Sequence, residues 1–371
     1  MPVIKIIDLK KIRKSKKPFQ AISADAFIEI EKALKEKKKI VIFINRRGLA
    51  TSVICQECGF VFKCPNCDIP LGFHSEHSDE SKKILMCHHC NYSTPMPSAC
   101  PACKGYKLKP LGVGIERIGE EIKKFIIPTP PFALIEGEMP DEEELDIFDK
   151  FNKGQIKILI GTEALLRPQL ESTDLLLIVS CDSAMFLPDY RSEEKVFLNL
   201  LKFKSLSKEK LIIQTLIPDN KLFQYFTKNE EEKFLQEEKK WRENYLWPPY
   251  VQLIKLTLSY KDKEKGVKEA EEIKKRLELA VDKLIPKELQ KNFIILGPAQ
   301  AFVFRKKGFY KWSILVKYKY FESKVKNDIN PLFGLNLLSP IPTKKELMLR
   351  DKILKYISSH WKIDVDPIDT L

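Results

Sequence analysis

The chain has 371 residues, a formal net charge of +13 at pH 7 and an apolar content of 44%. This length is sufficient for two domains and a small insertion, and no apolar run reaches the roughly 18 residues of a membrane span. The first 17 residues are rich in lysine but lack the apolar core of a secretion signal. These properties exclude a membrane protein and a secreted one, so we expect a soluble, cytoplasmic protein.

Basic residues are concentrated in two stretches. Residues 1–50 hold fourteen Lys and Arg against five Asp and Glu, and residues 301–320 hold six basic residues and no acidic one. Such patches attract polyanions. Nucleic acid is therefore the expected partner, and a lysine-rich composition without a binding role is the alternative.

The first half of the sequence alternates amphipathic segments with short, wholly apolar ones. Periodicity predicts helices near residues 25–38, 114–126, 141–151 and 191–203, and buried strands near 40–44, 132–135, 156–160, 175–179 and 211–217. This alternation is typical of an α/β domain with a mostly parallel sheet. The charged segment 219–244 is expected to form one helix that leads to a second domain.

From residue 247 onward the pattern changes. It predicts strands near 251–259, 293–296, 312–317 and 362–365, and helices near 265–284, 321–328 and 344–358. The order β-α-β-β-α-β suggests a ferredoxin-like or related α+β sandwich. The expected organisation is a first domain over residues 1–218 with an insertion at about 53–109, a helical connector over 219–246, and a C-terminal domain over 247–371.

Eight of the nine cysteines form four Cys-x-x-Cys pairs within residues 55–103. Each pair offers two thiolates from one tight turn, and eight thiolates fit two tetrahedral zinc sites. The nineteen residues between the second and third pairs match a zinc ribbon. The predicted ligands of one ion are therefore Cys64, Cys67, Cys87 and Cys90, and those of the other are Cys55, Cys58, Cys100 and Cys103. Four disulfides are the alternative, which a reducing compartment disfavours.

The sequence offers no clear catalytic site. A closed four-thiolate site leaves no open position for water, so both zinc ions are expected to be structural, and His88 and His89 are interpreted as bystanders. None of the fourteen glycines is followed by Lys-Ser or Lys-Thr, so a phosphate-binding P-loop is lacking. The acidic run 141–144 starts a predicted helix, where the helix dipole favours acids. Cys181 and Asp182 follow a buried strand and are interpreted as structural.

Two basic segments are candidates for nucleic-acid contacts. The candidate residues are Arg46, Arg47, Arg305, Lys306, Lys307 and Tyr310. The first two follow a predicted parallel strand, and the others form a predicted loop in which rings and charges alternate. Basic groups neutralise phosphates and exposed rings stack on unpaired bases, whereas rings that alternate along a strand usually face a core.

With these residues in view, the sequence resembles the PriA family of primosomal replication-restart helicases (primosomal protein N′), in its C-terminal half. The matching stretches are the eight-cysteine block and residues 43–48, 112–117, 158–162, 247–250, 296–299 and 364–367. The resemblance implies a second RecA-like helicase lobe with a two-zinc insertion and a C-terminal domain that binds DNA and partner proteins. It also implies binding of branched or single-stranded DNA, and contacts with primosome and single-strand-binding proteins.

The sequence departs from this family at positions that serve ATP hydrolysis. It lacks the first helicase lobe, and residues 202–210 lead directly to the next strand, where the family supplies an arginine to ATP. That arginine stabilises the transferring phosphoryl group, so ATP turnover by this chain alone is not expected. The favoured hypothesis is a DNA-binding primosome component. The alternatives are one half of a split 3′–5′ helicase and a zinc-stabilised protein-interaction module.

Overall fold

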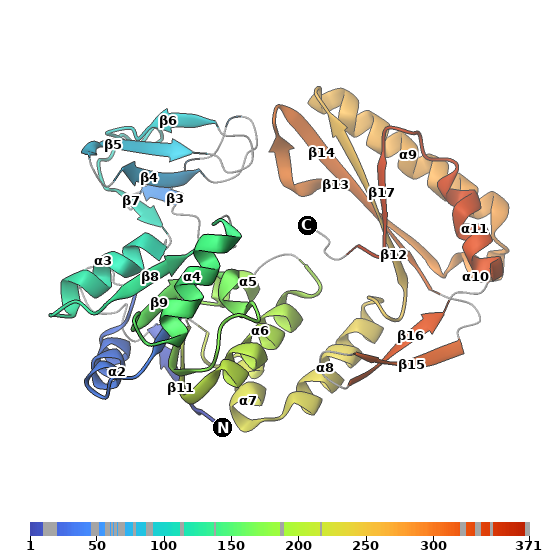
Figure 1. Ribbon diagram of the computed structural model, residues 1–371. Coiled ribbons are helices and arrows are strands. Elements are labelled where there is room, and N and C mark those ends of the chain that lie inside the picture. Colours follow the sequence, from blue (N-terminus) through green and yellow to red (C-terminus); the bar gives the residue numbers. More distant parts are fainter. Residues whose placement is uncertain are drawn as a thin grey trace.

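The computed structural model describes residues 1–9, 21–45, 52–55, 60, 62, 65, 71–76, 79–86, 92–111, 115–136, 139–185, 189–215, 217–319, 324–330, 335–341 and 344–367. Within these ranges the strands form sheets of six, five, four and two strands. Figure 1 shows the six-stranded sheet flanked by helices, and the four-stranded sheet joined to it through the segment that contains α8. Among the described residues, no helix combines the length and apolar character that crossing a bilayer requires.

A parallel sheet organises the first half of the chain. Its strand order is β1-β11-β10-β2-β9-β8, and all neighbouring strands are parallel. The strands are β1 Val3–Asp8, β2 Ile40–Phe43, β8 Phe132–Ile135, β9 Ile158–Gly161, β10 Thr173–Ile178 and β11 Ser207–Thr215. Central strands of such a sheet are buried on both faces and read as continuous apolar runs. The prediction of a mostly parallel α/β sheet is confirmed, but the edge strand β1 was not predicted.

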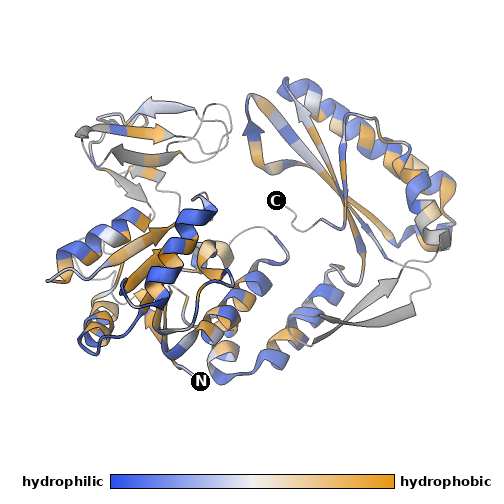
Figure 2. Cartoon of the chain, viewed as in Figure 1, coloured by the Kyte–Doolittle hydropathy of each residue, from blue (hydrophilic) through white to orange (hydrophobic). Residues whose placement is uncertain are grey.

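Helices cover both faces of this sheet (Figure 1). They are α2 Ala24–Lys35, α3 Ile115–Phe125, α4 Asp141–Asn152, α5 Asp182–Met185 and α6 Ser192–Leu206, with the short 3₁₀ helix η1 Glu163–Leu166. Successive residues of β2 enter opposite cores, because side chains alternate along a strand. Ile40 and Ile42 pack into the core that includes residues of α2 and α3, whereas Val41 and Phe43 pack into the core that includes residues of α4 and α6. In Figure 2 the apolar colour follows these strands.

The prediction of one helix over residues 219–244 is wrong. Two helices occupy this segment, α7 Lys221–Lys228 and α8 Glu231–Asn244. They are separated at Asn229, whose left-handed conformation (φ 56°) ends α7, and Asn adopts this conformation more readily than most residues. Phe223, Phe226 and Phe234 belong to the core of the parallel sheet. This segment is therefore packed onto the first half of the chain as well as leading out of it.

The cysteine-rich region, between β2 and α3, forms a five-stranded antiparallel sheet of order β6-β5-β4-β3-β7. Its strands are β3 Ser52–Cys55, β4 Gly72–Glu76, β5 Asp79–Met86, β6 Ser93–Pro95 and β7 Leu108–Leu111. Among the described residues of this region, Val53, Phe62, Leu71 and Leu85 form one buried hydrophobic cluster. In small units, bound metals commonly add to the stability that a hydrophobic core supplies.

The C-terminal part contains an antiparallel sheet of order β13-β14-β12-β17. Its elements are β12 Gln252–Tyr260, α9 Lys263–Leu284, α10 Lys287–Gln290, β13 Phe293–Lys306, β14 Phe309–Tyr318, α11 Lys344–Leu354 and β17 Lys362–Val365. Leu277 of α9 and Ile353 of α11 pack with Leu256 and Ile314 of the sheet in one core, so both helices cover the same face (Figure 1).

Two expectations for this part are corrected. The segment predicted as a helix near 321–328 instead contains strand β15, Lys324–Asn330, which pairs with β16, Leu335–Ile341. This pairing is antiparallel and cannot be deduced from local periodicity. The strand predicted at 293–296 continues to Lys306 through two register shifts, the first of them between Leu296 and Ala299. Gly297 permits the first shift, because its φ is +100° and an added Cβ would lie 2.8 Å from the Ser313 carbonyl oxygen.

Candidate metal centre and nucleic-acid interface

The pairing of β3 with β7 brings the two ends of the cysteine-rich region together. Cys55 is opposite Leu108 in the antiparallel register, and the turn that holds Cys100 and Cys103 shortly precedes β7. Cysteines that are 48 positions apart in sequence therefore become neighbours.

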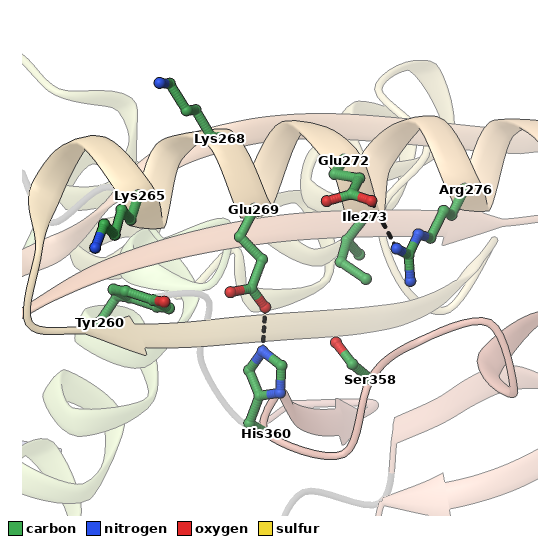
Figure 3. Close-up of a pocket in the computed structure, with 9 residues that line it drawn as sticks. All are labelled: Tyr260, Lys265, Lys268, Glu269, Glu272, Ile273, Arg276, Ser358 and His360. Atoms are coloured by element: carbon green, nitrogen blue, oxygen red, sulfur yellow. Dashed lines mark hydrogen bonds and ion pairs between the residues drawn. The ribbon is translucent and has the colours of Figure 1, made fainter.

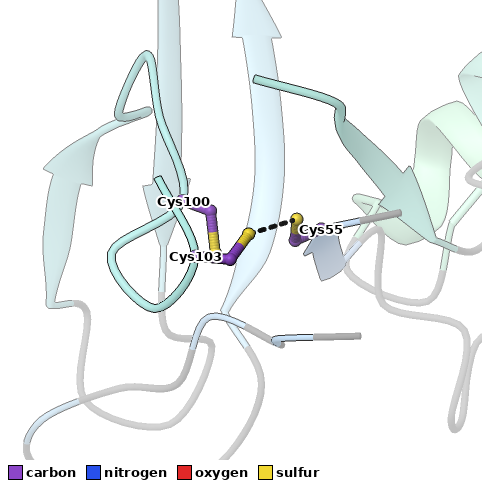
Figure 4. Close-up of side chains that lie close together, drawn as sticks. All are labelled: Cys55, Cys100 and Cys103. Atoms are coloured by element: carbon purple, nitrogen blue, oxygen red, sulfur yellow. Dashed lines mark hydrogen bonds between the residues drawn. The ribbon is translucent and has the colours of Figure 1, made fainter. Parts of the chain in front are cut away.

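The sulfur atoms of Cys55, Cys100 and Cys103 all lie within 4.8 Å of one another (Figure 4). The distance from Cys55 Sγ to Cys103 Sγ is 3.6 Å. In a tetrahedral zinc site with Zn–S bonds of about 2.3 Å, ligand sulfurs are about 3.8 Å apart. Three soft donors at this spacing fit a zinc ion, whereas a disulfide joins only two sulfurs at about 2 Å.

Backbone hydrogen bonds hold the turn that carries two of these sulfurs. The Cys100 N–H donates to the Gly105 carbonyl at 2.8 Å, and the Lys104 N–H donates to the Cys100 carbonyl at 2.9 Å. Lys104 has a positive φ of 62°, which closes the turn. Cys55 and Cys100 are buried and Cys103 is exposed, so the cluster lies at the edge of the region.

The other predicted ligands, Cys58, Cys64, Cys67, Cys87 and Cys90, lie outside the described residues, as do His88 and His89. The strands beside them are described. Gly72, the first residue of β4, pairs with Met86, the last residue of β5. The chain therefore enters and leaves this hairpin at the same end, five positions after Cys67 and directly before Cys87.

The predicted basic loop is mainly a hairpin between β13 and β14. Arg305 pairs with Tyr310 and Lys306 pairs with Phe309, so both basic residues belong to β13 rather than to a loop. Only Lys307 and Gly308 form the turn, with φ values of 51° and 81°. Arg46 and Arg47, the other predicted nucleic-acid contacts, lie outside the described residues.

Two of the predicted contact residues take part in internal packing. The Tyr310 ring lies 5.3 Å from that of Phe304 and 5.0 Å from the Arg305 guanidinium carbon. Arg305 also donates from Nη1 to the carbonyl of Pro65, the residue after Cys64. The hairpin thus contacts the cysteine-rich region through Arg305. Lys306 and Lys307 have no ion-pair partner in the part of the chain that the structure describes.

Sequence analysis missed two lysines beside this hairpin. Lys261 Nζ lies 5.6 Å from the centroid of the Phe309 ring, and Lys263 Nζ lies 5.9 Å from that of Phe304. They reach the hairpin because Tyr260, at the end of β12, pairs with Tyr310. No local signal links the two segments, which are about fifty positions apart.

A groove of about 410 Å³ lies between α9 and the turn before β17 (Figure 3). Its lining residues include Tyr260, Lys265, Glu269, Glu272, Arg276 and His360. Glu269 accepts hydrogen bonds from His360 and from the Trp361 indole, and Glu272 pairs with Arg276 at 2.6 Å. Both carboxylates are thus engaged by neighbours, which favours a structural role in holding this turn against α9.

Comparisons with known proteins agree on one family. The family model described as "Primosomal protein N C-terminal domain" matches residues 243–368, and that described as "PriA DNA helicase Cys-rich region (CRR) domain" matches residues 64–95. The chain is 33% identical over 318 residues to replication restart protein PriA of Borreliella burgdorferi, with 84% of this chain and 46% of the relative covered. It is 30% identical over 379 residues to PriA of Rickettsia conorii, with 99% and 52% covered. The chain thus spans about half the length of these relatives.

Proposed function

Because the chain belongs to the PriA family, as a relative of the C-terminal half of its members, we propose that it is a DNA-binding component of the replication-restart primosome. Its partners would be branched or single-stranded DNA, other primosome proteins and single-strand-binding proteins. One observation carries the DNA-binding part. Lys306 and Lys307 lie at the end of the β13–β14 hairpin without ion-pair partners among the described residues, and such lysines suit a phosphate backbone.

We assign the parallel sheet to a second RecA-like helicase lobe and the C-terminal part to a ferredoxin-like sandwich. The order β13-β14-β12-β17 supports the second assignment. In it, β14 lies between β12 and β13, and β12 lies between β14 and β17, which is the split βαβ arrangement. The proposed boundaries are 1–218, with the insertion at about 53–109, then 219–246 and 247–371.

We assign two structural zinc ions to the cysteine-rich region, with the nested ligand sets predicted from spacing. The convergence of Cys55, Cys100 and Cys103 supports the outer set, and the shared end of the β4–β5 hairpin supports the inner one. Closed thiolate sites contribute free energy of folding and do not activate water. The ions would thereby hold the surface that Arg305 contacts.

We further propose that this chain alone binds DNA without ATP turnover. The acidic run 141–144 is the first turn of α4, and Glu144, with a side chain only 3% exposed, pairs with Arg167 at 2.6 Å. Asp182, at the end of the sheet, accepts a hydrogen bond from the Thr215 hydroxyl. Both groups have structural partners, which favours packing over magnesium binding.

A fluorescence-anisotropy titration on forked, single-stranded and duplex DNA tests this function. Affinity should fall steeply between 50 and 200 mM salt, and the double variant Lys306→Glu/Lys307→Glu should weaken binding to all DNA forms. Absence of salt-dependent DNA binding would favour the protein-interaction module. ATP turnover that appears only on mixing with a separate first lobe would favour the split helicase.

A further inference from the structure

One aromatic ring of the β13–β14 hairpin differs from its neighbours in exposure. Phe304, Tyr310 and Trp312 pack together, with centroid distances of 5.3 Å from Phe304 to each of the other two. All three belong to or pack against the C-terminal core. Phe309, which follows the turn, is 37% exposed. Much of the Phe309 ring stays in water in the folded protein, so its burial contributes little to the free energy of folding.

The start of α9 places further lysines at this ring. Lys261 lies directly before the Asp262 cap of the helix, and its Nζ is 5.6 Å from the Phe309 centroid. Gly266 fixes this approach, because an added Cβ would lie 2.4 Å from the Trp312 ring. The first turn of α9 therefore packs directly against the hairpin. This packing keeps the lysines at the start of α9 close to the hairpin.

The local charges favour a polyanion. Lys261, Lys263 and Lys307 are exposed, and they have no ion-pair partner among the described residues. Asp262 and Glu264 are exposed in the same turn, but the Asp262 carboxylate accepts the Lys265 N–H at 2.9 Å as the helix cap. The charged group at the Phe309 ring is thus a cation, Lys261, and Lys263 lies at the neighbouring Phe304 ring.

We propose that Phe309, with Lys261 against its ring and Lys307 in the adjacent turn, is a stacking site for an unpaired base of single-stranded nucleic acid. This inference rests on the proposed DNA-binding function and adds the form of nucleic acid that the hairpin selects. A ring stacks on any unpaired base, whereas bases in a duplex are already stacked on one another. The flanking ammonium groups would neutralise the phosphates on either side of that base.

The test compares Phe309→Leu with Phe125→Leu in the full chain, by anisotropy with a fluorescent oligo-dT strand and a duplex. Phe125 on α3 is a matched control, because it is the same residue type and is also 37% exposed. Phe309→Leu should weaken oligo-dT binding about tenfold and leave duplex binding unchanged. Phe309→Tyr should bind like the wild type, since it keeps a ring, and Phe125→Leu should also be unaffected.

Variants of single lysines distinguish the stacking site at Phe309 from the broader proposal of DNA binding. Lys261→Ala should weaken oligo-dT binding and lower the salt slope by about one ion, whereas Lys283→Ala at the far end of α9 should not. If lysine variants weaken single-strand and duplex binding equally while Phe309→Leu has no effect, DNA binding stands and the stacking site is wrong. If the wild type binds neither oligo-dT nor the duplex, the proposed DNA-binding function is itself wrong. Preferential binding of an acidic peptide at the same residues would also overturn the inference.

Discussion

Lys317 Nζ lies 3.4 Å from the centroid of the Trp247 ring, and this contact joins the C-terminal sheet to the end of the connecting helices. The same ammonium group donates to the Tyr245 carbonyl at 2.9 Å. Trp247 also stacks on Tyr190 of the first half, with centroids 4.9 Å apart and planes at 3°. One indole therefore contacts both halves of the molecule, and it lies in the Trp-Pro-Pro-Tyr stretch that carried part of the family resemblance.

Replacing Trp247 with alanine should loosen the two halves from each other. The variant loses the stacking on Tyr190 and the cation–π contact with Lys317, together with apolar burial, and we expect a loss of about 2–4 kcal/mol of stability. Hydrogen exchange should increase in β14 and around Tyr190. Trp247→Phe keeps a ring and should retain most of the protection. Unchanged exchange in the alanine variant would show that the contact does not hold the halves together.

Lys317 makes stability depend on pH. Burial lowers the pKa of Lys317 to about 8, against about 10.4 in an unfolded chain. Below pH 8 the lysine is charged in both states, and the folded state bears the full cost of burying that charge. As the pH rises from about 8 to 10.4, the folded state releases the proton first, and stability increases by at most about 3 kcal/mol.

The matched variant for this effect is Lys317→Met, which keeps the length of the side chain but cannot titrate. Denaturant unfolding at pH 7, 8, 9 and 10 should show a smaller rise in stability with pH for the variant than for the wild type. Other lysines and tyrosines titrate in this range in both proteins, so the difference between the two curves is the quantity of interest. Parallel curves would contradict the assignment.

Arg242 is a second buried cation at this junction. Its side chain lies 2.9 Å from both Glu194 and Glu238, and it donates to the Pro248 carbonyl at 3.3 Å. The charges of Arg242 and Arg191 lower the pKa of Glu194 even though burial acts in the opposite direction. Arg242→Ala should destabilise the chain by about 3–5 kcal/mol, because it leaves the largely buried Glu238 without this cation and Glu194 with Arg191 alone.

Thermal unfolding provides the measurement for Arg242, with Arg276→Ala as the control. Arg276 also pairs with a glutamate four residues away, but on the exposed surface of α9, where such pairs contribute less than about 1 kcal/mol. A similar loss in both variants would argue that burial of Arg242 does not determine its contribution.

The sequence was most informative where local pattern determines structure. Ile40–Phe43 lies within a residue of its predicted bounds, because a strand buried on both faces needs uninterrupted apolar residues. The break at Asn229 depends on one backbone conformation, and strand β15 depends on pairing with its neighbour β16. Neither the break at Asn229 nor the β15–β16 pairing can be read from the charge pattern of the sequence. The same holds for Lys261, which reaches Phe309 only through the pairing of β12 with β14.

Removing the metal should make the eight paired cysteines reactive toward iodoacetamide and leave Cys181 unreactive. Burial raises the pKa of the Cys181 thiol, with a smaller contribution from Asp182, so it remains a protonated, inaccessible thiol. A strong chelator should remove the proposed zinc ions and so loosen the hydrophobic cluster that contains Val53 and Leu85. Iodoacetamide should then modify eight cysteines per chain, while Cys181 stays unmodified. Mass spectrometry of the labelled peptides gives the count.

The metal content of single variants tests the assignment of the ligands. Cys100→Ser should lower zinc from about two ions to about one per chain, because it removes a ligand of one closed site and leaves the other intact. Cys181→Ala should retain both ions. Protection from hydrogen exchange should fall in β3 and β7 of the Cys100 variant, since those strands bring Cys55 to the cluster. Equal zinc content in the two variants, or linked thiols in metal-free protein, would rule out this arrangement.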